Sequence, residues 1–189
     1  MQRKHFDVLI STAGLILAVV LLVFGLYLKD QRDFANNTVS DQLSQQKINF
    51  KPAEALTDEE KEQPGLVKYA GEAVDNGDKA RVYADEFIGL HLKATGEDES
   101  LWGLTYAELG NLQRQDPPPD NIEAINETRE TVFKGETLRG LLLTTYGFWQ
   151  LGQEAEFAMT ISFIGAALLF LFALLGYLHA LRTPKDATI

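Results

Sequence analysis

Residues that commonly carry catalysis or bind metals are few in this chain. It has 189 residues, no cysteine and three histidines, of which only His91 lies away from the termini, the others being His5 and His179. Without cysteine, disulfides, thiolate nucleophiles, iron–sulfur clusters and thiolate zinc sites are excluded. Three scattered histidines do not supply the clustered ligands of a metal or haem site. We therefore expect no catalytic residue, no metal site and no cofactor.

His91 is the one candidate for acid–base chemistry. Asp85 and Glu86 precede it by six and five residues, so they do not share a tight helical face with it. A general base also needs a nucleophile or metal partner, and the sequence indicates none. We interpret His91 as a packed or surface histidine. That the protein is an enzyme is the third of our hypotheses about its function. A charge-to-alanine scan that abolished a measured turnover would support it.

Charge and hydropathy are distributed unevenly along the chain. The formal net charge is −10, which disfavours nucleic-acid binding because no basic patch is available to neutralise phosphates. The mean hydropathy of −0.10 resembles that of a soluble protein. That average is misleading, however, because the apolar residues are concentrated near the two ends.

Two apolar segments predict transmembrane helices. Residues 8–28 and 157–178 contain no formal charge and comprise 21 and 22 residues. A helix of that length spans roughly 31 Å, close to the thickness of a bilayer core. The first segment is longer than a signal-peptide core and lacks an Ala-x-Ala-like cleavage site, so we interpret it as an uncleaved anchor.

The charges that flank the spans predict the orientation. The two ends carry four Lys and Arg and a net charge of +2, whereas residues 30–156 carry a net charge of −13. By the positive-inside rule we place both termini in the cytoplasm, with the inverse topology as the alternative. The expected organisation is a cytoplasmic N-terminus (1–7), a transmembrane helix (8–28), an extracytoplasmic helical domain (29–156), a second transmembrane helix (157–178) and a cytoplasmic C-terminus (179–189).

The middle segment is long enough for a domain of its own, and its local signals are helical. It has little alternation of period two, so we expect an all-α protein. Capping boxes begin at Thr57 and Thr105, and Pro64-Gly65 is expected to end the first of these helices. A turn at 75–78 opens a helix that Thr95-Gly96 ends, and Asp120 is expected to cap the next helix. That last helix has an apolar side made of Ile122, Ile125, Val132 and Phe133.

Leu138 to Leu151 is more apolar than a surface helix should be. One interpretation makes it the core of the outer domain, docked near the membrane. The other makes its apolar face a contact with another membrane protein. Tyr146 and Trp149 are candidates for the headgroup level, where amphipathic aromatic side chains are favoured.

Small residues at helical spacing indicate close helix packing inside the membrane. Gly14 and Ala18 form one pair, and Ala158, Ser162 and Ala166 form a longer row. Such rows let two backbones approach closely, either the two spans of this chain or a span and another protein. Glu156, at the start of the second span, is either a solvated flank or a pairing contact with a partner subunit.

Several short stretches carry a resemblance to a known group. They are Val39–Leu43 with Gln46–Pro52, then Tyr69–Gly71 with Tyr83–Ile88 and His91-Leu92, then Phe133–Leu143 with Tyr146–Trp149. With the two spans, they make nearly the whole chain similar to small actinobacterial two-span membrane proteins that resemble the respiratory supercomplex association factor. The acidic stretch 97–102 departs from that pattern. The resemblance brings no catalytic residue with it.

The resemblance implies a non-catalytic accessory subunit of a respiratory supercomplex in a bacterial plasma membrane. The expected partners are membrane lipids and the integral subunits of the cytochrome bcc complex and the aa3-type cytochrome c oxidase. The acidic outer domain could also attract a basic mobile electron carrier by long-range steering. The alternative is a stand-alone membrane-anchored protein that binds a lipid or small ligand, which predicts a roomy apolar pocket in the outer domain.

Overall fold

The structure, a computed structural model, describes residues 2–184 and 187–188. In this part of the chain every regular element is helical, which confirms the expected all-α class, and the only strand-like pairings are two isolated bridges. The α-helices are α1 (Arg3–Gln46), α2 (Asp58–Lys61), α3 (Pro64–Lys68), α4 (Gly77–Val82), α5 (Gly89–Leu92), α6 (Tyr106–Gln113) and α7 (Ile122–Arg182). Two short 3₁₀ turns, η1 (Ala53–Ala55) and η3 (Glu99–Leu101), and one π-helix, η2 (Tyr83–Ile88), complete the set.

The chain divides into two compact units. Unit 1 comprises Met1–Ala35 and Leu151–Ile189, and unit 2 comprises Asn36–Gln150. The long helices α1 and α7 contribute to both units, whereas the short helices all belong to unit 2.

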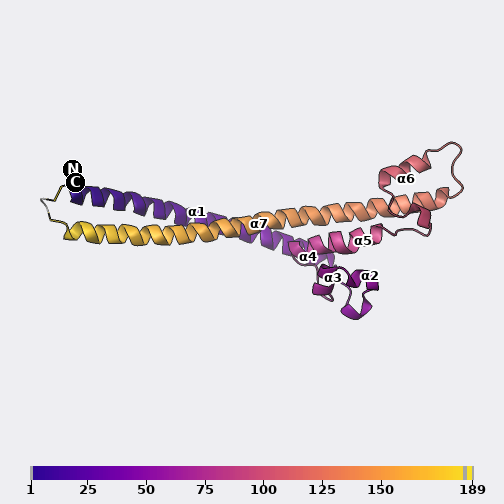
Figure 1. Ribbon diagram of the computed structural model, residues 1–189, viewed down its shortest axis with the longest axis horizontal. Helices are drawn as coiled ribbons and strands as arrows, with labels where there is room; N and C mark the ends of the chain where they lie inside the picture. The colour runs from indigo at the N-terminus through magenta and orange to yellow at the C-terminus, as the bar shows by residue number, and fades with distance from the viewer. Residues whose placement is uncertain (1, 185–186, 189) are drawn as a thin grey trace. The chain divides into compact units, whose positions relative to one another are not determined.

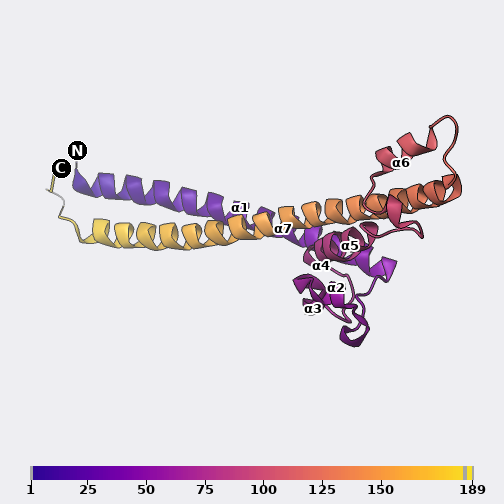
Figure 2. The same ribbon diagram turned by 45° about the vertical axis from the view of Figure 1, so that its right-hand side comes forward.

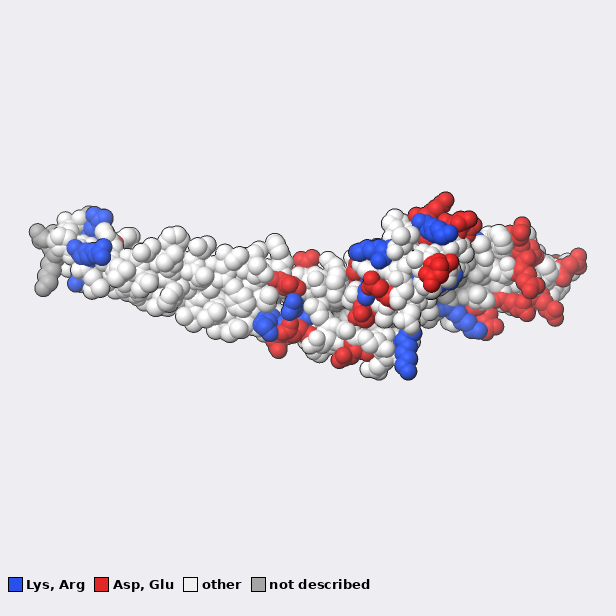
Figure 3. Space-filling model, turned by 90° about the horizontal axis from the view of Figure 1, so that it is seen from below, with Lys and Arg blue, Asp and Glu red and all other residues white. Residues whose placement is uncertain are grey.

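Unit 1 is a pair of antiparallel helices. Both α1 and α7 contain an apolar stretch long enough to cross a membrane, and the two helices include the predicted spans 8–28 and 157–178. The two chain ends lie side by side, as Figures 1 and 2 show. There Gln2 and Thr188 form an antiparallel bridge, and the Arg3 amide donates to the Ala187 carbonyl at 3.1 Å. In Figure 3 the surface between the ends of unit 1 is free of charged residues.

Small residues line the seam between the two helices of unit 1. Ala18, Ser162, Ala166 and Ala173 are all buried there. A Cβ atom added to Gly14 would lie 3.8 Å from the Ala173 Cβ atom, an ordinary packing distance. The residues with four-residue spacing thus let the two spans of this chain pack on each other, one of the two arrangements expected from the sequence.

A hydrogen bond joins the same two helices. The hydroxyl oxygens of Thr12 and Tyr177 lie 2.8 Å apart, and the Thr12 hydroxyl also donates to the Val8 carbonyl. This hydrogen bond between two apolar helices fixes their register. If one helix slid along the other, the Thr12 and Tyr177 hydroxyls would no longer be within hydrogen-bonding distance.

Unit 2 has two apolar clusters. The larger joins the end of α1, the loop 48–56, helices α3 to α5 and the middle of α7, and its most buried large side chains are Leu43, Leu66, Val74 and Leu142. The smaller packs α6 and the turn at Leu101 onto the first turns of α7 through Leu109, Ile125 and Val132. Phe133, expected on the apolar side of α7, is instead 54% exposed and contacts the ring of Tyr106.

Side-chain caps define where α2, α4 and α6 begin. Both predicted capping boxes are confirmed, Thr57 with Glu60 at α2 and Thr105 with Glu108 at α6. The Asn76 side chain caps α4 by accepting a hydrogen bond from the Lys79 amide at 3.0 Å.

Two expected helix boundaries are wrong. Pro64 does not end a helix but is the first residue of α3, a position where its missing N–H costs nothing. Helix α7 begins at Ile122, and the Asn121 carbonyl accepts its first backbone bond, so Asp120 is not the capping residue.

One continuous helical rod runs from Gly77 to Leu92 through α4, η2 and α5. The turn at 75–78 opens it as predicted, and it ends before the expected stop at Thr95-Gly96. Its middle turn is a π-helix, a wide turn that proteins often keep next to functional sites.

Candidate functional site

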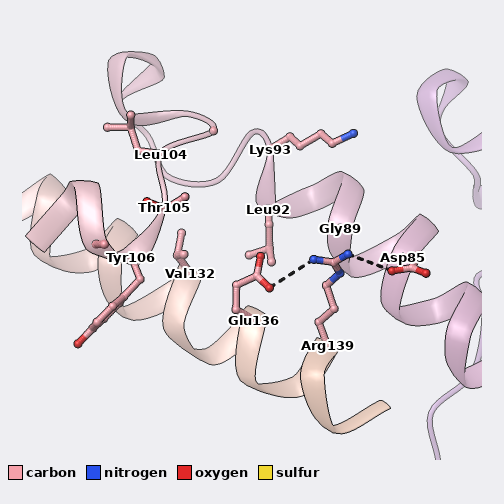
Figure 4. A pocket seen from close by; sticks show the side chains of 12 residues that line it. Asp85, Gly89, Leu92, Lys93, Leu104, Thr105, Tyr106, Val132, Glu136 and Arg139 are labelled. Carbon is pink, nitrogen blue, oxygen red and sulfur yellow. Dashed lines mark hydrogen bonds and ion pairs between the residues drawn. The ribbon is translucent and has the colours of Figure 1, made fainter. Parts of the chain in front are cut away.

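A pocket of about 590 Å³ opens in unit 2 between α5, the loop after it, the start of α6 and the middle of α7. Figure 4 shows that its side chains form two groups, charged residues near Asp85 and Arg139 and apolar residues near Leu104 and Val132. The lining residues are Asp85, Gly89, Leu92, Lys93, Gly103, Leu104, Thr105, Tyr106, Ala107, Val132, Glu136 and Arg139.

The charged end of the pocket is organised by Arg139. Its guanidinium donates to Asp85 Oδ1 at 3.0 Å and to Glu136 Oε2 at 3.4 Å (Figure 4). The hydrogen bond to Asp85 raises the pKa of Arg139 despite partial burial. The Arg139 Nε atom is buried and has no hydrogen-bond partner among the described residues. Lys93 follows Leu92 at the end of α5, and in Figure 4 its side chain points away from this charged group.

The apolar end is formed by side chains from three separate segments. Leu92 comes from α5, Leu104 from the loop before α6, and Val132 from α7. Gly89 lies between the two ends, and a Cβ atom there would meet only the Ala84 carbonyl at 3.5 Å and Arg139 Nε at 3.7 Å. The absence of a side chain at Gly89 therefore leaves this part of the pocket open.

This arrangement suits binding. An apolar wall with a few convergent polar groups is the usual composition of a small-molecule site, and 590 Å³ lies within the usual size range. The described residues contain no cluster of three or more His, Asp or Glu side chains that could hold a metal ion.

His91 belongs to a second polar cluster, with Glu60 and Lys51. Glu60 is buried, its Oε1 atom lying 2.7 Å from Lys51 Nζ and 3.3 Å from His91 Nε2. His91 Nδ1 lies 2.7 Å from the Phe87 carbonyl, and the His91 ring packs on the Phe87 ring. Both ring nitrogens face acceptors, so both contacts are hydrogen bonds only when the imidazole is protonated. His91 thus packs against its neighbours, as interpreted from the sequence.

The span residues singled out from the sequence lie mainly in the seam of unit 1. Ala18, Ser162 and Ala166 are buried, whereas Gly14 and Ala158 are half-buried. The Ser162 hydroxyl donates to the Ala158 carbonyl of its own helix at 2.8 Å.

The two aromatic candidates pack within unit 2. Trp149 lies directly over Gly77 and adjoins the larger apolar cluster. Tyr146 lies beside Trp149, and the Arg81 guanidinium lies 5.8 Å from the centre of its ring. Both residues therefore connect α7 to α4.

Glu156 pairs within the chain. Its Oε2 atom accepts from Arg32 Nε at 3.2 Å, and Arg32 also pairs with Asp33 at 2.8 Å. Hydrogen bonds from Lys29 and Arg32 lower the pKa of Asp33. This group of charges lies just beyond the predicted spans, on α1 and α7.

Residues 138–151 fit each of the two sequence interpretations in part: the first was the core of the outer domain, and the second was a contact with another membrane protein. Leu142 is 2% exposed in the core of unit 2, which fits the first. Leu141 is 61% exposed, which leaves an apolar face for the second. On this face nothing lies within 4 Å of where a Cβ atom would stand at Gly140 or Gly147.

Sequence reasoning missed the residues that line the pocket and the burial of Glu60. Asp85 and Arg139 are 54 residues apart, and no local pattern connects them. From the sequence, Glu60 was recognisable only as the last residue of the capping box that begins at Thr57. The comparisons with known proteins add no further assignment, because no family model, curated protein or solved structure matches the chain.

Proposed function

We propose that this protein is a non-catalytic accessory subunit of a respiratory supercomplex, held in the plasma membrane by two spans. Its partners in this proposal are integral subunits of the cytochrome bcc complex and the aa3-type oxidase, as the resemblance of its sequence motifs implies. It would stabilise their association through its spans and its acidic domain.

The observation that carries the proposal is the exposed side of α7 around Leu141, Gly140 and Gly147. Exposed apolar faces of this kind commonly mark contacts with other proteins. The two glycines would let the backbone of a partner helix approach closely, as small residues do between membrane helices. The seam of unit 1 is filled by the chain's own side chains, so this face supplies a docking surface that the seam does not.

Native co-purification tests the proposal. The full chain is tagged at its C-terminus and extracted in a mild detergent, and the haem spectrum of the tagged band is read on a native gel. We expect a large band with cytochrome b, c and a absorbance. A small colourless band that persists in the mildest detergent would refute the proposal.

Two matched variants locate the contact. Leu141→Glu places a carboxylate on the exposed apolar face of α7, whereas Thr131→Glu places one at another exposed position of the same helix. We expect Leu141→Glu to lose the haem-containing band and Thr131→Glu to keep it. Equal behaviour of the two variants would place the contact elsewhere.

The proposed topology, with both termini in the cytoplasm, has its own test. The chain has no cysteine, so single cysteines report accessibility without background. We expect a membrane-impermeant maleimide to label Asn111→Cys in intact spheroplasts and Thr183→Cys only after permeabilisation. The reverse pattern would establish the inverse topology.

One observation favours the alternative of a membrane-anchored ligand-binding protein. That alternative predicts a roomy apolar pocket in the outer domain, and unit 2 has a pocket of about 590 Å³ whose lining is part apolar and part charged.

A further inference from the structure

We propose that a cavity between the two helices of unit 1 binds a primary ammonium group that carries an apolar chain. The cavity has a volume of about 230 Å³ and lies toward the end of unit 1 where the two chain ends meet (Figure 1). Asp7 and Ser11 would bind the ammonium group, and apolar walls would hold the chain. This inference concerns unit 1 alone and does not depend on the accessory role.

Asp7 is a carboxylate that lacks a hydrogen-bond donor. It directly precedes the predicted span 8–28, its side chain is 18% exposed, and its Oδ2 atom is buried without a hydrogen-bond partner. In the part of the chain that the structure describes, the only basic side chain within 4.0 Å is His179. Its Nε2 atom lies 3.7 Å from Asp7 Oδ2, which is too far for a hydrogen bond. A carboxylate that is largely removed from water without gaining donors costs free energy, so the site calls for a donor from outside the chain.

Ser11 supplies a second unused polar group, one turn further along α1. The residue is 4% exposed and lines the same cavity as Asp7. Thr12 and Ser162 of unit 1 each bond a carbonyl of their own helix, whereas the Ser11 hydroxyl forms no hydrogen bond with any residue that the structure describes. It lies against Gly176 of α7, where a Cβ atom would overlap the Ser11 oxygen. A buried hydroxyl without a partner thus faces the cavity next to a carboxylate without a donor.

These two acceptors select the chemistry of the head. A primary ammonium group has three N–H donors and a positive charge, so it can bond Asp7 and Ser11 at once and neutralise the carboxylate. A hydroxyl group has one donor and no charge, and a quaternary ammonium group has a charge but no donor. A calcium or magnesium ion takes about six oxygen ligands or more, which this cavity does not offer. No residue that lines the cavity is cationic, so an ammonium head meets no like charge there.

The apolar chain is argued from the rest of the walls. Phe6 and Ile10 of α1 face Leu169 and Phe172 of α7 across the cavity. Covering these side chains with an apolar group is favourable, and a bare ammonium ion would leave them uncovered. The volume lies below the usual range for small-molecule sites, about 300–1,000 Å³, so the cavity suits a small head with a short stretch of chain.

The test of the head uses native mass spectrometry of the full chain, released from micelles of an uncharged detergent. The probes are octylamine and octyltrimethylammonium, which share the chain and the charge and differ in their N–H donors. We expect octylamine to bind about tenfold more tightly, because only its head can donate to Asp7 and Ser11. Equal binding of the two probes, or binding of neither, would overturn the assignment of the head.

Matched aspartate variants test the site. Asp7→Asn keeps the shape of the side chain and removes its charge, whereas Asp30→Asn removes the charge of an exposed aspartate of α1 outside the cavity. We expect Asp7→Asn to weaken octylamine binding by about tenfold and Asp30→Asn to leave it unchanged. Equal affinities of the two variants would place the ammonium group elsewhere.

Matched serine variants test the site without changing its charge, so they remain informative even if Asp7→Asn fails to fold. Ser11→Ala should weaken octylamine binding about threefold, because one hydrogen bond to the head is lost. Ser162→Ala removes the hydroxyl of another buried serine of unit 1, outside the cavity, and should leave binding unchanged. The same affinity in both variants would refute the part assigned to Ser11.

A second arm identifies the source of the ammonium group. The wild-type chain is incubated with phosphatidylethanolamine or phosphatidylcholine that have the same acyl chains. Preferential retention of phosphatidylethanolamine, lost in Asp7→Asn, would assign the site to a lipid head. Octylamine binding without that preference would assign it to a soluble amine. Co-purification with haem-containing complexes is a separate readout, so the accessory role and this site can fail independently.

Discussion

Glu60 places a carboxylate in the interior of unit 2, where its side chain is 1% exposed. Burial alone raises the pKa of Glu60, but hydrogen bonds from Lys51 and the Thr57 amide, with the charges of Lys51 and His91, outweigh burial and leave the pKa below its usual value. The carboxylate therefore joins α2, the loop before it and α5 through three partners. A buried charge is retained when its partners satisfy it in this way.

Glu60→Gln should lower the free energy of unfolding of unit 2 by about 2 kcal/mol, because Lys51 and His91 lose their anionic partner in a buried position. Lys51 is 37% exposed, so water screens part of the loss. The measurement is urea unfolding of the full chain in micelles, followed by the fluorescence of Trp102 and Trp149. The control Glu59→Gln, at the neighbouring exposed position, should leave the midpoint unchanged; a shift as large as that of Glu60→Gln would argue against the buried ion pair.

The pH dependence follows from the lowered pKa of Glu60. In the acid range the unfolded state binds a proton at Glu60 before the folded state does. The stabilisation that the Glu60 carboxylate provides is complete above the pKa of Glu60 in the unfolded chain, about 4.3. It is lost as the pH falls through the lower pKa of Glu60 in the folded state. Urea midpoints of the wild type should therefore fall more steeply than those of Glu60→Gln below that pH. Parallel curves would mean that Glu60 contributes nothing to acid sensitivity.

At the scale of the elements, the short helices of unit 2 end within a few residues of their start, and three of them, α2, α4 and α6, begin at side-chain caps. Helices of four to eight residues are unstable alone, so caps and packing together hold them. Helix α6 has both: the Thr105–Glu108 capping box at its start and buried Leu109 against α7. Its position also determines the apolar end of the pocket, because Thr105, Tyr106 and Ala107 line it.

Thr105→Ala should destabilise α6 by about 1 kcal/mol, because the Glu108 amide loses its acceptor. Faster hydrogen exchange at the Glu108 and Leu109 amides measures this. Thr137→Ala, an exposed threonine inside α7 that bonds only its own helix, serves as the control and should leave those amides unaffected. Unchanged exchange in Thr105→Ala would mean that packing alone holds α6.

At the scale of the whole molecule, the two units have surfaces of different polarity. Unit 1 exposes large apolar side chains along both helices and buries small ones between them, the reverse of a water-soluble helix pair. Unit 2 buries two apolar clusters and exposes most of its charges. This contrast supports a membrane location for the apolar stretches of unit 1.

A designed disulfide tests the seam of unit 1. The Cβ atoms at positions 14 and 173 would lie 3.8 Å apart, within the usual range of a disulfide, about 3.5–4.5 Å. The double variant Gly14→Cys with Ala173→Cys should therefore oxidise to an intramolecular bridge, seen after proteolysis between the helices. Leu17→Cys with Ala173→Cys, whose first position is 49% exposed, should not. Equal bridging in both pairs would contradict the packing.

Features that depend on neighbouring residues in the chain could be predicted from the sequence. The apolar stretches follow from composition, and the starts of α2, α4 and α6 follow from local cap residues. Boundaries were mispredicted where one residue can signal either the end or the start of a helix, as at Pro64, which is the first residue of α3. The exposure of Phe133 could not be predicted, because its ring is not buried in the core but contacts the ring of Tyr106, which is distant in the sequence.

The sequence by itself determined that this is a helical protein with two apolar helices long enough to cross a membrane, because hydrophobicity and capping act over a few residues. Only the tertiary structure decided that Glu60 is buried between Lys51 and His91, and that Asp85 and Arg139 meet across a pocket. Those contacts join segments far apart in the chain. Their geometry depends on how whole helices pack, which no local pattern of residues encodes.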